Sequence, residues 1–326
     1  MERLLDVRDL HVHFESRGKD PLKAVDGVSF GVSRGSTLGI VGESGCGKSV
    51  TCLSILQLVQ SPPGVYAGGE ILYDGQDTLK MDKLRLRALR GAEIAMIFQE
   101  PMAALNPVFT VGQQLCEAIR LHRQVSKPEA QELAIDILRQ VRVPDAIRIF
   151  HSYAFNLSGG LRQRVMIAIA ISCQPGLLIA DEPTTALDVT IQSKIMALLR
   201  KLRDDTGMAM ILVSHDLNLV SENADDILVM YAGRVCEHAT TEAIVKKPMH
   251  PYTLGLIASR PTGIAAGKRL NAIPGTVPSL ADRPEGCAFH PRCGAAMEQC
   301  RTNAPPDTLF SDGHMVSCWK FAEETA

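Results

Sequence analysis

The sequence predicts an α/β protein built around a parallel sheet. Short, mostly apolar runs lie at 37–41 (TLGIV), 94–98 (IAMIF), 177–180 (LLIA) and 211–214 (ILVS), with helical stretches between them. Runs of this length without polar alternation are typical of buried strands. Polar residues follow three of these runs directly, and a glycine-rich segment follows the first. Such sheets bind ligands at the carboxyl ends of their strands.

The most specific stretch is 42–49, which reads GESGCGKS and fits the pattern G-x-x-x-x-G-K-[ST]. It lies between a predicted strand and a predicted helix over 50–60, the order that a phosphate-binding loop requires. Gly42, Gly45 and Gly47 let the backbone curl tightly and turn its N–H groups inward, toward a helix N-terminus that favours phosphate. Lys48 is predicted to reach the β- and γ-phosphates, and Ser49 to hold Mg²⁺.

Acidic residues follow the apolar run 177–180. Asp181 is predicted to support Mg²⁺, directly or through water, and Glu182 to orient and polarise the attacking water. The alternative, two solvated acids in a turn, is disfavoured because Pro183 and the segment TTALD follow at once. His215 ends the run 211–214; a lone histidine is usually structural, but in this series we expect it to contact the γ-phosphate.

Three further positions carry weaker signals. Phe14, in an alternating strand over 3–14, either stacks on a nucleotide base or is a half-buried strand aromatic. Gln99 ends a strand before Pro101; this placement suits a ligand-sensing loop, although local sequence alone favours an exposed turn. Residues 158–160 (SGG) precede a buried helical run and form a second candidate phosphate site.

The remaining pattern places strands early and helices in the middle. Segments 3–14, 25–32 and 70–77 read as strands, and beside the parallel core they predict an antiparallel subdomain. Residues 61–69 (SPPGVYAGG) read as a loop. Helical spacing covers 78–91 and 110–142.

Composition excludes several classes of protein. The chain has 326 residues, 46% of them hydrophobic and 21% charged, as in an ordinary globular protein. Its net charge of −2 gives no bulk attraction to nucleic acid. No apolar run approaches the roughly 18–20 residues of a membrane span, and the N-terminus lacks a signal-peptide core. We therefore expect a cytosolic chain that reaches a membrane only through partners.

The motifs GESGCGKS, IFQEP, LSGGLRQR, LLIADEP, TTALD and SHD occur in this order in one chain. Over about residues 3–260 this set resembles the nucleotide-binding domain of ATP-binding cassette (ABC) transporters, and the LSGG signature distinguishes that family from other P-loop proteins. The resemblance implies a P-loop NTPase fold with a RecA-like parallel core, an antiparallel β subdomain and a helical signature subdomain at about 100–170. We accordingly divide the chain into a nucleotide-binding domain, 1–260, and a Cys-rich C-terminal extension, 261–326.

The resemblance also implies a role for each motif. Two such domains close head to tail over two ATP molecules, and the signature contacts the γ-phosphate of the ATP held by the opposite subunit. Asp188 then lies in the D-loop at the dimer seam, His215 is the switch histidine, and Gln99 touches Mg²⁺ and the lytic water. The implied positions are, for ATP, Phe14, Gly42, Glu43, Ser44, Gly45, Cys46, Gly47, Lys48, Ser49, Leu157, Ser158, Gly159, Gly160 and Asp188; for Mg²⁺, Ser49, Gln99 and Asp181; and for catalysis, Glu182, His215 and Gln99.

A narrower resemblance comes from FQEPMAALNP, DEPTTALDVTIQ, HDLNLV and KKPMHPYTLGLI. These stretches are similar to the ATPases of oligopeptide and dipeptide importers, a group that also contains nickel and glutathione importers. The tail segments NAIPGTVPSL, GCAFHPRC, EQC and VSCW resemble that group's C-terminal extension.

This resemblance implies an ATPase, peripheral at the cytoplasmic face of the cell membrane, that powers import of dipeptides or oligopeptides. Its implied partners are two transmembrane permeases, a second ABC ATPase in a heterodimer and, indirectly, an extracytoplasmic solute-binding protein. Nickel or another small solute stays open as the cargo. A different class, a soluble ABC ATPase acting on ribosomes or DNA, is disfavoured by the single cassette and the lack of heptads or basic charge.

Four of the nine cysteines cluster late in the chain: Cys287, Cys293, Cys300 and Cys318. Their spacing fits neither the common zinc templates nor the usual ferredoxin patterns. Four thiols in a Pro/Gly-rich segment with little apolar core still indicate a metal-stapled unit. Because some peptide-importer ATPases carry a [4Fe–4S] cluster on such cysteines, the resemblance favours that cluster, with zinc or free thiols as alternatives.

Cys46 is the main departure from the family pattern, since serine is commoner there. Its thiol makes the loop a candidate for inactivation by alkylation.

Overall fold

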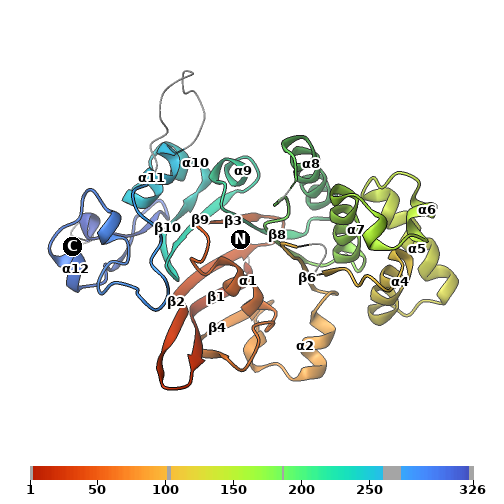
Figure 1. Cartoon of the computed structure of the whole chain (residues 1–326), viewed down its shortest axis with the longest axis horizontal. Coiled ribbons are helices and arrows are strands. Elements are labelled where there is room, and N and C mark those ends of the chain that lie inside the picture. Colours follow the sequence, from red (N-terminus) through yellow and green to blue (C-terminus); the bar gives the residue numbers. More distant parts are fainter. Residues whose placement is uncertain (1–2, 101–103, 186, 260–272, 323–326) are drawn as a thin grey trace. The chain divides into compact units, whose positions relative to one another are not determined.

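The structure, a computed structural model, describes residues 3–100, 104–185, 187–259 and 273–322 (Figure 1). The chain forms two compact units. Unit 1 comprises Ser33–Ser36 and Lys80–Leu212, and unit 2 comprises Arg3–Val32, Thr37–Leu79 and Val213–Ala326. The expected domain boundary at 260/261 lies outside the described residues.

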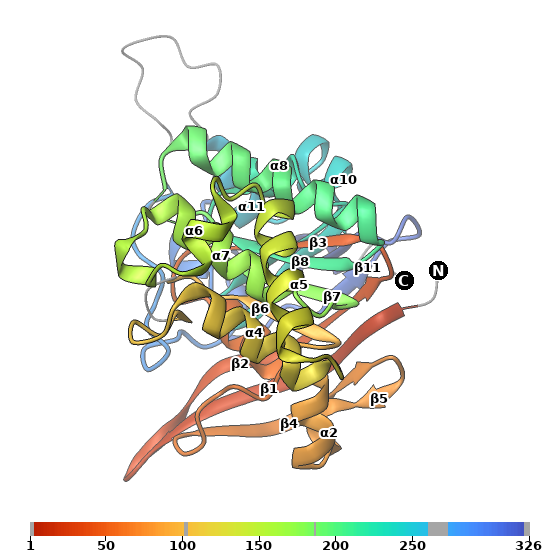
Figure 2. The same cartoon turned by 90° about the vertical axis from the view of Figure 1, so that its right-hand side faces the viewer.

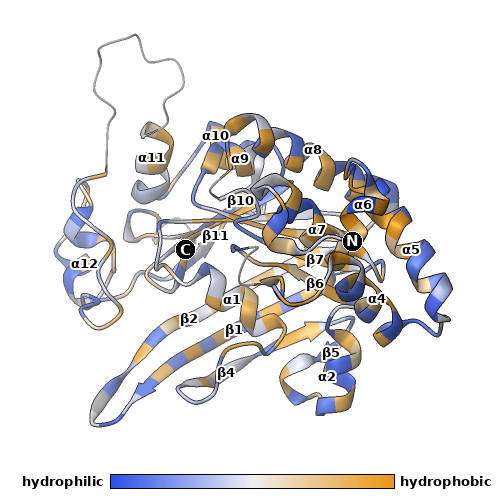
Figure 3. Ribbon diagram, turned by 45° about the vertical axis from the view of Figure 1, so that its right-hand side comes forward, coloured by the Kyte–Doolittle hydropathy of each residue, from blue (hydrophilic) through white to orange (hydrophobic). Residues whose placement is uncertain are grey.

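Unit 2 contains an antiparallel sheet of β1 (Arg3–Ser16), β2 (Lys19–Ser33), β4 (Gly64–Tyr73) and β5 (Gln76–Asp77), in the order β2-β1-β4-β5. The alternation of apolar and polar residues along β1 and β2 is visible in Figure 3. Because successive side chains of a strand point to opposite faces, this alternation places the apolar residues on one buried face.

The expected loop over 61–69 is wrong beyond its first residues, because β4 begins at Gly64 and pairs with β1. The two glycines that indicate a loop instead mark an irregularity in that pairing, between Arg8 and Val12. Gly69 has φ +90°, and a Cβ there would lie 2.3 Å from the carbonyl oxygen of Asp9. A strand can therefore continue through this position only with glycine.

The second sheet of unit 2 runs in the order β11-β12-β10-β9-β3. The strands β3 (Thr37–Val41) and β9 (Asp226–Tyr231) are almost wholly buried and pair in parallel, and β10 (Arg234–Thr240) returns antiparallel to β9. The short strands β12 (Met315–Ser317) and β11 (Asp307–Leu309) come from the C-terminal segment and extend this sheet antiparallel. The C-terminal segment is thus joined through β12 and β10 to the same sheet as β3, the strand that precedes residues 42–49.

The helices of unit 2 are short. They are α1 (Lys48–Ile55), α9 (Leu217–Ser221), α10 (Thr241–Lys246), α11 (Pro251–Ala258) and α12 (Gln299–Thr302), with 3₁₀ turns η1 (Thr78–Lys80), η3 (His290–Arg292) and η4 (Trp319–Phe321). The predicted helix over 50–60 therefore begins two residues earlier and ends five residues earlier.

Unit 1 joins parallel strands to a group of helices. Its strands β6 (Ile94–Ile97) and β7 (Leu177–Asp181) are parallel, and β8 (Ala209–Ser214) lies beside β7. Its helices are α2 (Lys83–Leu89), α4 (Val111–His122), α5 (Lys127–Gln140), α6 (Ala146–Phe150), α7 (Gly159–Ile171) and α8 (Val189–Thr206), with the 3₁₀ turn η2 (Ala154–Asn156).

The helices α4 to α7 pack on one another, as Figure 2 shows. Capping boxes begin two of them: Thr110 bonds with Gln113 at the start of α4, and Ser126 with Glu129 at the start of α5. Reciprocal bonds of this kind satisfy backbone groups that the first helical turn leaves open. The α/β prediction with parallel and antiparallel sheets is confirmed.

Among the described residues, no helix is both long enough and apolar enough to span a membrane.

Candidate functional site

The phosphate-binding sequence forms a tight loop between β3 and α1. All five residues of β3 are buried, so the strand fixes where the loop begins. Gly47 is the N-cap of α1 and makes no side-chain cap bond. An N-cap without a side chain leaves N–H groups of the first helical turn for an external acceptor, and a phosphate is a suitable one.

Two glycines of this loop have no room for a side chain. A Cβ on Gly42 would lie 2.3 Å from the carbonyl oxygen of Met230. Gly47 has φ +102°, and a Cβ there would lie 2.5 Å from the carbonyl oxygen of Ala24. The loop is therefore a cradle of bare backbone pressed against its own unit, and this is the geometry that the glycines of the motif predict.

Lys48 is folded over the loop. Its Nζ donates to the carbonyl oxygens of Gly42 at 2.8 Å and Glu43 at 3.0 Å, and the side chain is almost fully buried. Two neutral carbonyls do not balance a buried ammonium, whereas a phosphate would. The loop therefore fits a triphosphate by its bare N–H groups, its missing Cβ atoms and its lysine.

Cys46 is fully buried behind Lys48, with its Sγ 3.7 Å from the lysine Nζ. Burial raises the pKa of the Cys46 thiol above its ordinary value. Since alkylation requires an accessible thiolate, the structure argues against the expected inactivation at this thiol.

Unit 1 brings Gln99 and Glu182 together. The Gln99 Nε2 donates to Glu182 Oε2 at 2.9 Å, and the Thr185 hydroxyl donates to the same oxygen at 2.8 Å. Glu182 has φ +46°, an uncommon conformation for a residue other than glycine. The carboxylate is thus fixed in direction by its backbone and by two donors, as an orienting group for water needs to be.

Asp181 ends the buried strand β7, and its side chain is only 4% exposed. A buried carboxylate at a strand end provides hard oxygen ligands of the kind that Mg²⁺ prefers. Ser49 lies half-buried in the first turn of α1, in unit 2.

The signature sequence begins helix α7 and contacts the segment around Asp188. Ser158 is the N-cap of α7 but makes no side-chain cap bond, and Gly159 is exposed. A Cβ on Gly160 would lie 3.2 Å from Ile191 Cγ2. Asp188 itself is the N-cap of α8, and its side chain accepts from the Ile191 backbone N–H at 2.9 Å. This bond gives Asp188 a structural role besides the one expected at a dimer seam.

Phe14 and His215 lie in unit 2. Phe14 is half-buried on β1, opposite Gly64 of β4, and a Cβ on Gly64 would lie 3.5 Å from its ring. His215 follows β8 and is exposed. Leu157, the first residue of the signature, is buried in unit 1 and thus anchors it.

The four late cysteines form one group in unit 2. Burial, together with the nearby thiols of Cys300, Cys318 and Cys293, raises the pKa of the Cys287 thiol to about 11. Burial likewise raises the pKa of Cys293 and of Cys318, each with contributions from other members of the group. None of the four forms a disulfide. Mutual influence of this kind requires that the thiols lie near one another.

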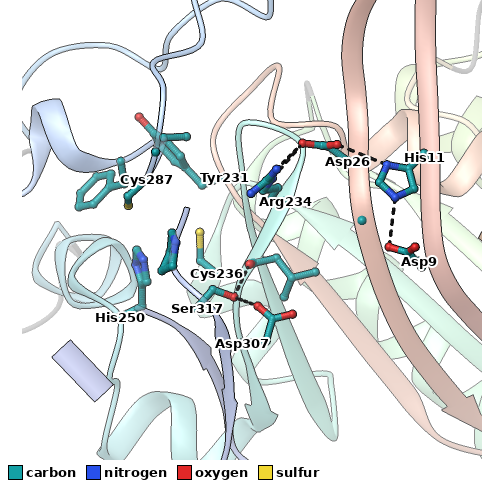
Figure 4. A pocket seen from close by; sticks show the side chains of 16 residues that line it. Asp9, His11, Asp26, Tyr231, Arg234, Cys236, His250, Cys287, Asp307 and Ser317 are labelled. Atoms are coloured by element: carbon teal, nitrogen blue, oxygen red, sulfur yellow. Dashed lines mark hydrogen bonds and ion pairs between the residues drawn. The ribbon is translucent and has the colours of Figure 1, made fainter. Parts of the chain in front are cut away.

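A cavity of about 320 Å³ adjoins this group and is shown in Figure 4. Its wall contains Cys236 and Cys287 beside the ion pairs of Asp26 with His11 and Arg234. The guanidinium groups of Arg234 and Arg283 overcome the effect of burial and lower the pKa of Asp26 to about 2. Asp26 therefore joins the antiparallel sheet to the C-terminal segment as a charged group.

Comparisons with known proteins agree with these features. The ABC transporter family model matches residues 25–185, and a model of the oligopeptide/dipeptide transporter C-terminal region matches residues 236–300. The chain belongs to the ABC transporter family. It is an ABC ATPase of the group that carries the oligopeptide/dipeptide C-terminal region, and this confirms the predicted membership.

Relatives match over nearly their whole length. The chain is 47% identical to the oligopeptide transport ATP-binding protein AppD of Bacillus subtilis, over 100% of this chain and 99% of that protein. It is 47% identical to the dipeptide transport ATP-binding protein DppD of Escherichia coli, over 97% of this chain and 96% of that one. A dimeric post-hydrolysis structure of the ATP-binding cassette MJ0796 with ADP and Pi matches with a TM-score of 0.66 and 27% identity, over 73% of this chain and 98% of that chain.

The sequence analysis missed three residues that support the site. Thr185 belongs to the quoted segment TTALD, but nothing in the pattern indicated a bond to Glu182. Tyr252 and Arg292, which hold the P-loop residue Glu43, lie more than 200 positions away from it in sequence. Arg292 sits between two of the late cysteines, and that unusual setting was the only available signal.

Proposed function

We propose that this ABC ATPase is the ATP-hydrolysing subunit of an importer that moves dipeptides or oligopeptides across the cytoplasmic membrane. The proposal rests on its full-length relatives, which are an oligopeptide and a dipeptide transport ATP-binding protein. The match of residues 236–300 to the C-terminal region of those transporters supports it further.

The proposed chemistry assigns a task to each group of residues. The loop Gly42–Ser49 binds the triphosphate, and Ser49, Gln99 and Asp181 hold Mg²⁺, which shields the phosphate charge when bound. Glu182 orients and polarises the attacking water, while His215 contacts the γ-phosphate. Leu157, Ser158, Gly159, Gly160 and Asp188 act on the ATP of a second ABC ATPase, and Phe14 stacks on the adenine.

Loss of the lysine charge tests the binding part of this assignment. In Lys48→Ala the bound triphosphate loses a buried counter-charge, so we expect nucleotide affinity to fall by about 100-fold. Equilibrium titration with a fluorescent ATP analogue measures it, with the exposed Lys83→Ala as control. Unchanged affinity would place the nucleotide elsewhere.

An exposed apolar surface on unit 1 supports membrane permeases as partners. Val108 is 70% exposed and Phe155 53%, and the rings of Tyr153 and Phe155 stack at 5.6 Å. The two segments are adjacent, because Thr110 pairs with Tyr153. Contiguous apolar surface of this kind marks a binding site for another protein.

Co-purification tests the transport assignment. The tagged chain, isolated from detergent-solubilised membranes, should bring two polytopic permeases and a second ABC ATPase, in line with a peripheral location at the cytoplasmic face. The variant Val108→Ser/Phe155→Ser should lose the permeases while it keeps nucleotide affinity, and the exposed Leu84→Ser serves as control. Recovery of ribosomal proteins alone would refute the transport assignment.

We also propose that Cys287, Cys293, Cys300 and Cys318 hold a [4Fe–4S] cluster. The proposal is supported by the grouping of the four thiols, each of Cys287, Cys293 and Cys318 lying near enough to other members to influence their pKa. Four thiolates are the usual ligands of such a cluster.

Anaerobic purification tests the cluster. Four iron and four acid-labile sulfide per chain, with visible absorption that Cys293→Ser abolishes, are expected. One zinc per chain without sulfide, or no metal at all, would overturn the proposal.

A further inference from the structure

Glu43, the second residue of the P-loop, is fixed at three points. Its backbone N–H donates to the Tyr252 hydroxyl at 2.9 Å, and its carbonyl oxygen accepts from Lys48 Nζ at 3.0 Å. Its carboxylate forms a two-pronged ion pair with Arg292, at 2.7 Å from Nη1 to Oε2 and 3.1 Å from Nη2 to Oε1. Two of these three partners lie outside the loop.

All three nitrogen atoms of the Arg292 guanidinium donate hydrogen bonds. Besides Glu43, its Nε donates to the Pro274 carbonyl at 2.8 Å, Nη1 to the Tyr231 hydroxyl at 3.3 Å and Nη2 to the Gly275 carbonyl at 3.3 Å. The side chain is 5% exposed. A planar fork with all its donors engaged holds one orientation, which a lysine in its place cannot reproduce.

The backbone of Arg292 belongs to the turn that carries the cysteines. It ends η3, and Cys293 follows directly. The Arg292 N–H donates to the Phe289 carbonyl, and the Cys287 N–H to the Cys300 carbonyl at 2.9 Å. The position of the guanidinium is therefore set by the fold of the C-terminal segment 273–322.

An aromatic cluster braces the same contact. The rings of Tyr231, Tyr252 and Phe289 lie 4.8–5.3 Å apart, and the Arg292 guanidinium lies 5.8 Å from the Tyr231 ring centre. These rings come from β9, α11 and the C-terminal segment. Displacement of the segment would disturb the ion pair and the Tyr252 bond to the loop together.

The Arg292 side chain is buried, whereas the Glu43 side chain is 33% exposed. Removing Glu43 would leave the buried guanidinium charge uncompensated, so the pair resists loosening. The bare P-loop has few side chains of its own to hold it, because glycine occupies three of its eight positions. A rigid contact at Glu43 thus limits the conformations that the loop adopts before nucleotide arrives. Restricting a site to its binding conformation raises affinity by lowering the ordering cost.

We propose that Arg292 is a positioning residue for the P-loop, and that the C-terminal segment thereby sets the affinity of the loop for nucleotide. The inference rests on the proposed binding of ATP by Gly42–Ser49. It extends that proposal by making a segment outside the nucleotide-binding motifs part of the nucleotide-binding equilibrium.

The coupling acts in both directions. If an ordered segment raises nucleotide affinity, bound nucleotide must stabilise the segment by the same factor. Backbone amides of residues 287–300 should therefore exchange more slowly when nucleotide is present, and this protection should disappear when Arg292 is replaced.

The first experiment measures the dissociation constant of a fluorescent ATP analogue for the full chain. In Arg292→Gln we expect affinity to fall by about tenfold, and in Arg292→Lys by a smaller factor, because the charge stays while the fork is lost. The KM for ATP should rise in parallel, with kcat at saturating ATP within about twofold. Arg301→Gln, at an exposed arginine of the same segment, should bind as the wild type does.

Glu43→Gln removes the same contact from the loop side without touching the segment. It should weaken binding to a similar degree, and the double variant Arg292→Gln/Glu43→Gln should be little worse than either single variant. If Arg292→Gln does not fold, the nucleotide affinity of Glu43→Gln by itself tests the inference.

Wild-type affinity in a folded Arg292→Gln or in Glu43→Gln, or additive losses in the double variant, would overturn the inference. Lys48→Ala separates this failure from that of the proposed function. Retained binding in Lys48→Ala would refute the nucleotide site itself, whereas lost binding in Lys48→Ala with normal binding in Arg292→Gln would refute only the coupling.

Discussion

The P-loop after β3 and the turn at Glu182 after β7 both follow fully buried strands, but they keep their shapes by different means. The P-loop relies on glycines that press against neighbouring backbone and on contacts to Glu43 from Tyr252 and Arg292. The Glu182 turn keeps a non-glycine residue at positive φ and fixes its carboxylate with Gln99 and Thr185.

The difference follows from what each loop is proposed to hold. A polyphosphate needs many backbone N–H groups close at hand, so side chains are excluded and support comes from elsewhere in the fold. A water molecule needs one well-directed acceptor, so a single side chain is aimed and its support is local. Changes within the Glu182 turn should therefore affect turnover, and changes around the P-loop should affect binding.

The largest effect is expected for Glu182→Gln. Without the carboxylate, the attacking water is neither oriented nor polarised, so hydrolysis should fall by about 100-fold or more while ATP still binds. Steady-state phosphate release and nucleotide titration measure the two properties separately. Glu132→Gln, at an exposed residue of α5, is the control, and near-normal turnover in Glu182→Gln would assign the general base to another group.

The next effect concerns the close approach of the P-loop backbone. Gly47→Ala would place a Cβ 2.5 Å from the Ala24 carbonyl oxygen, so we expect nucleotide affinity to fall by about 30-fold or more. Gly45→Ala is a matched control, because Gly45 also has positive φ but open space around it. Equal losses in the two variants would show that backbone strain, and not the close approach, limits the loop.

Loss of one donor to Glu182 should have a smaller effect. Thr185→Val removes the hydroxyl at 2.8 Å and leaves Gln99 in place, so kcat should fall by about tenfold, as expected for a hydrogen bond to a charged group. The KM for ATP should change little. Thr190→Val, at an exposed position in α8, controls for the substitution, and a raised KM with unchanged kcat would place Thr185 in binding.

The last effect concerns stability rather than activity, and it is a pH dependence at His250, next to Tyr252. His250 is 2% exposed, and its Nδ1 accepts from the Tyr252 N–H at 3.0 Å. Burial lowers the pKa of His250 to about 4, below its ordinary 6.5, so the unfolded chain takes up a proton that the folded chain does not between these values. Stability is therefore fully present above pH 6.5 and is lost as pH falls toward 4, by about 2 kcal/mol at pH 5.

The His250→Asn variant keeps a cap acceptor but does not titrate. Its melting temperature should fall less between pH 7 and pH 5 than that of the wild type, with the exposed His151→Asn as control. Equal falls in wild type and His250→Asn would show that other groups carry the acid sensitivity.

Several strands and the P-loop could be predicted from short stretches of the sequence. The apolar runs predicted the buried strands β3, β6, β7 and β8, because strands covered on both faces tolerate few polar residues. The glycine spacing predicted the P-loop, because bare backbone there is a local requirement. Boundaries were less secure: α1 ends at Ile55 rather than 60, and β4 extends into the expected loop 61–69. Pairing with β1 decides the second case, and no local pattern reports it.

The sequence by itself determined the fold class, the order of the motifs and the ABC transporter family, since each rests on residue types at short, fixed spacing. Only the tertiary structure showed that Thr185 and Gln99 share one carboxylate oxygen, that Cys46 is buried, and that Arg292 reaches Glu43. Contacts between residues far apart in the chain depend on how the strands pair and where the helices pack. Such contacts therefore cannot be predicted from the residue types next to either partner in the sequence.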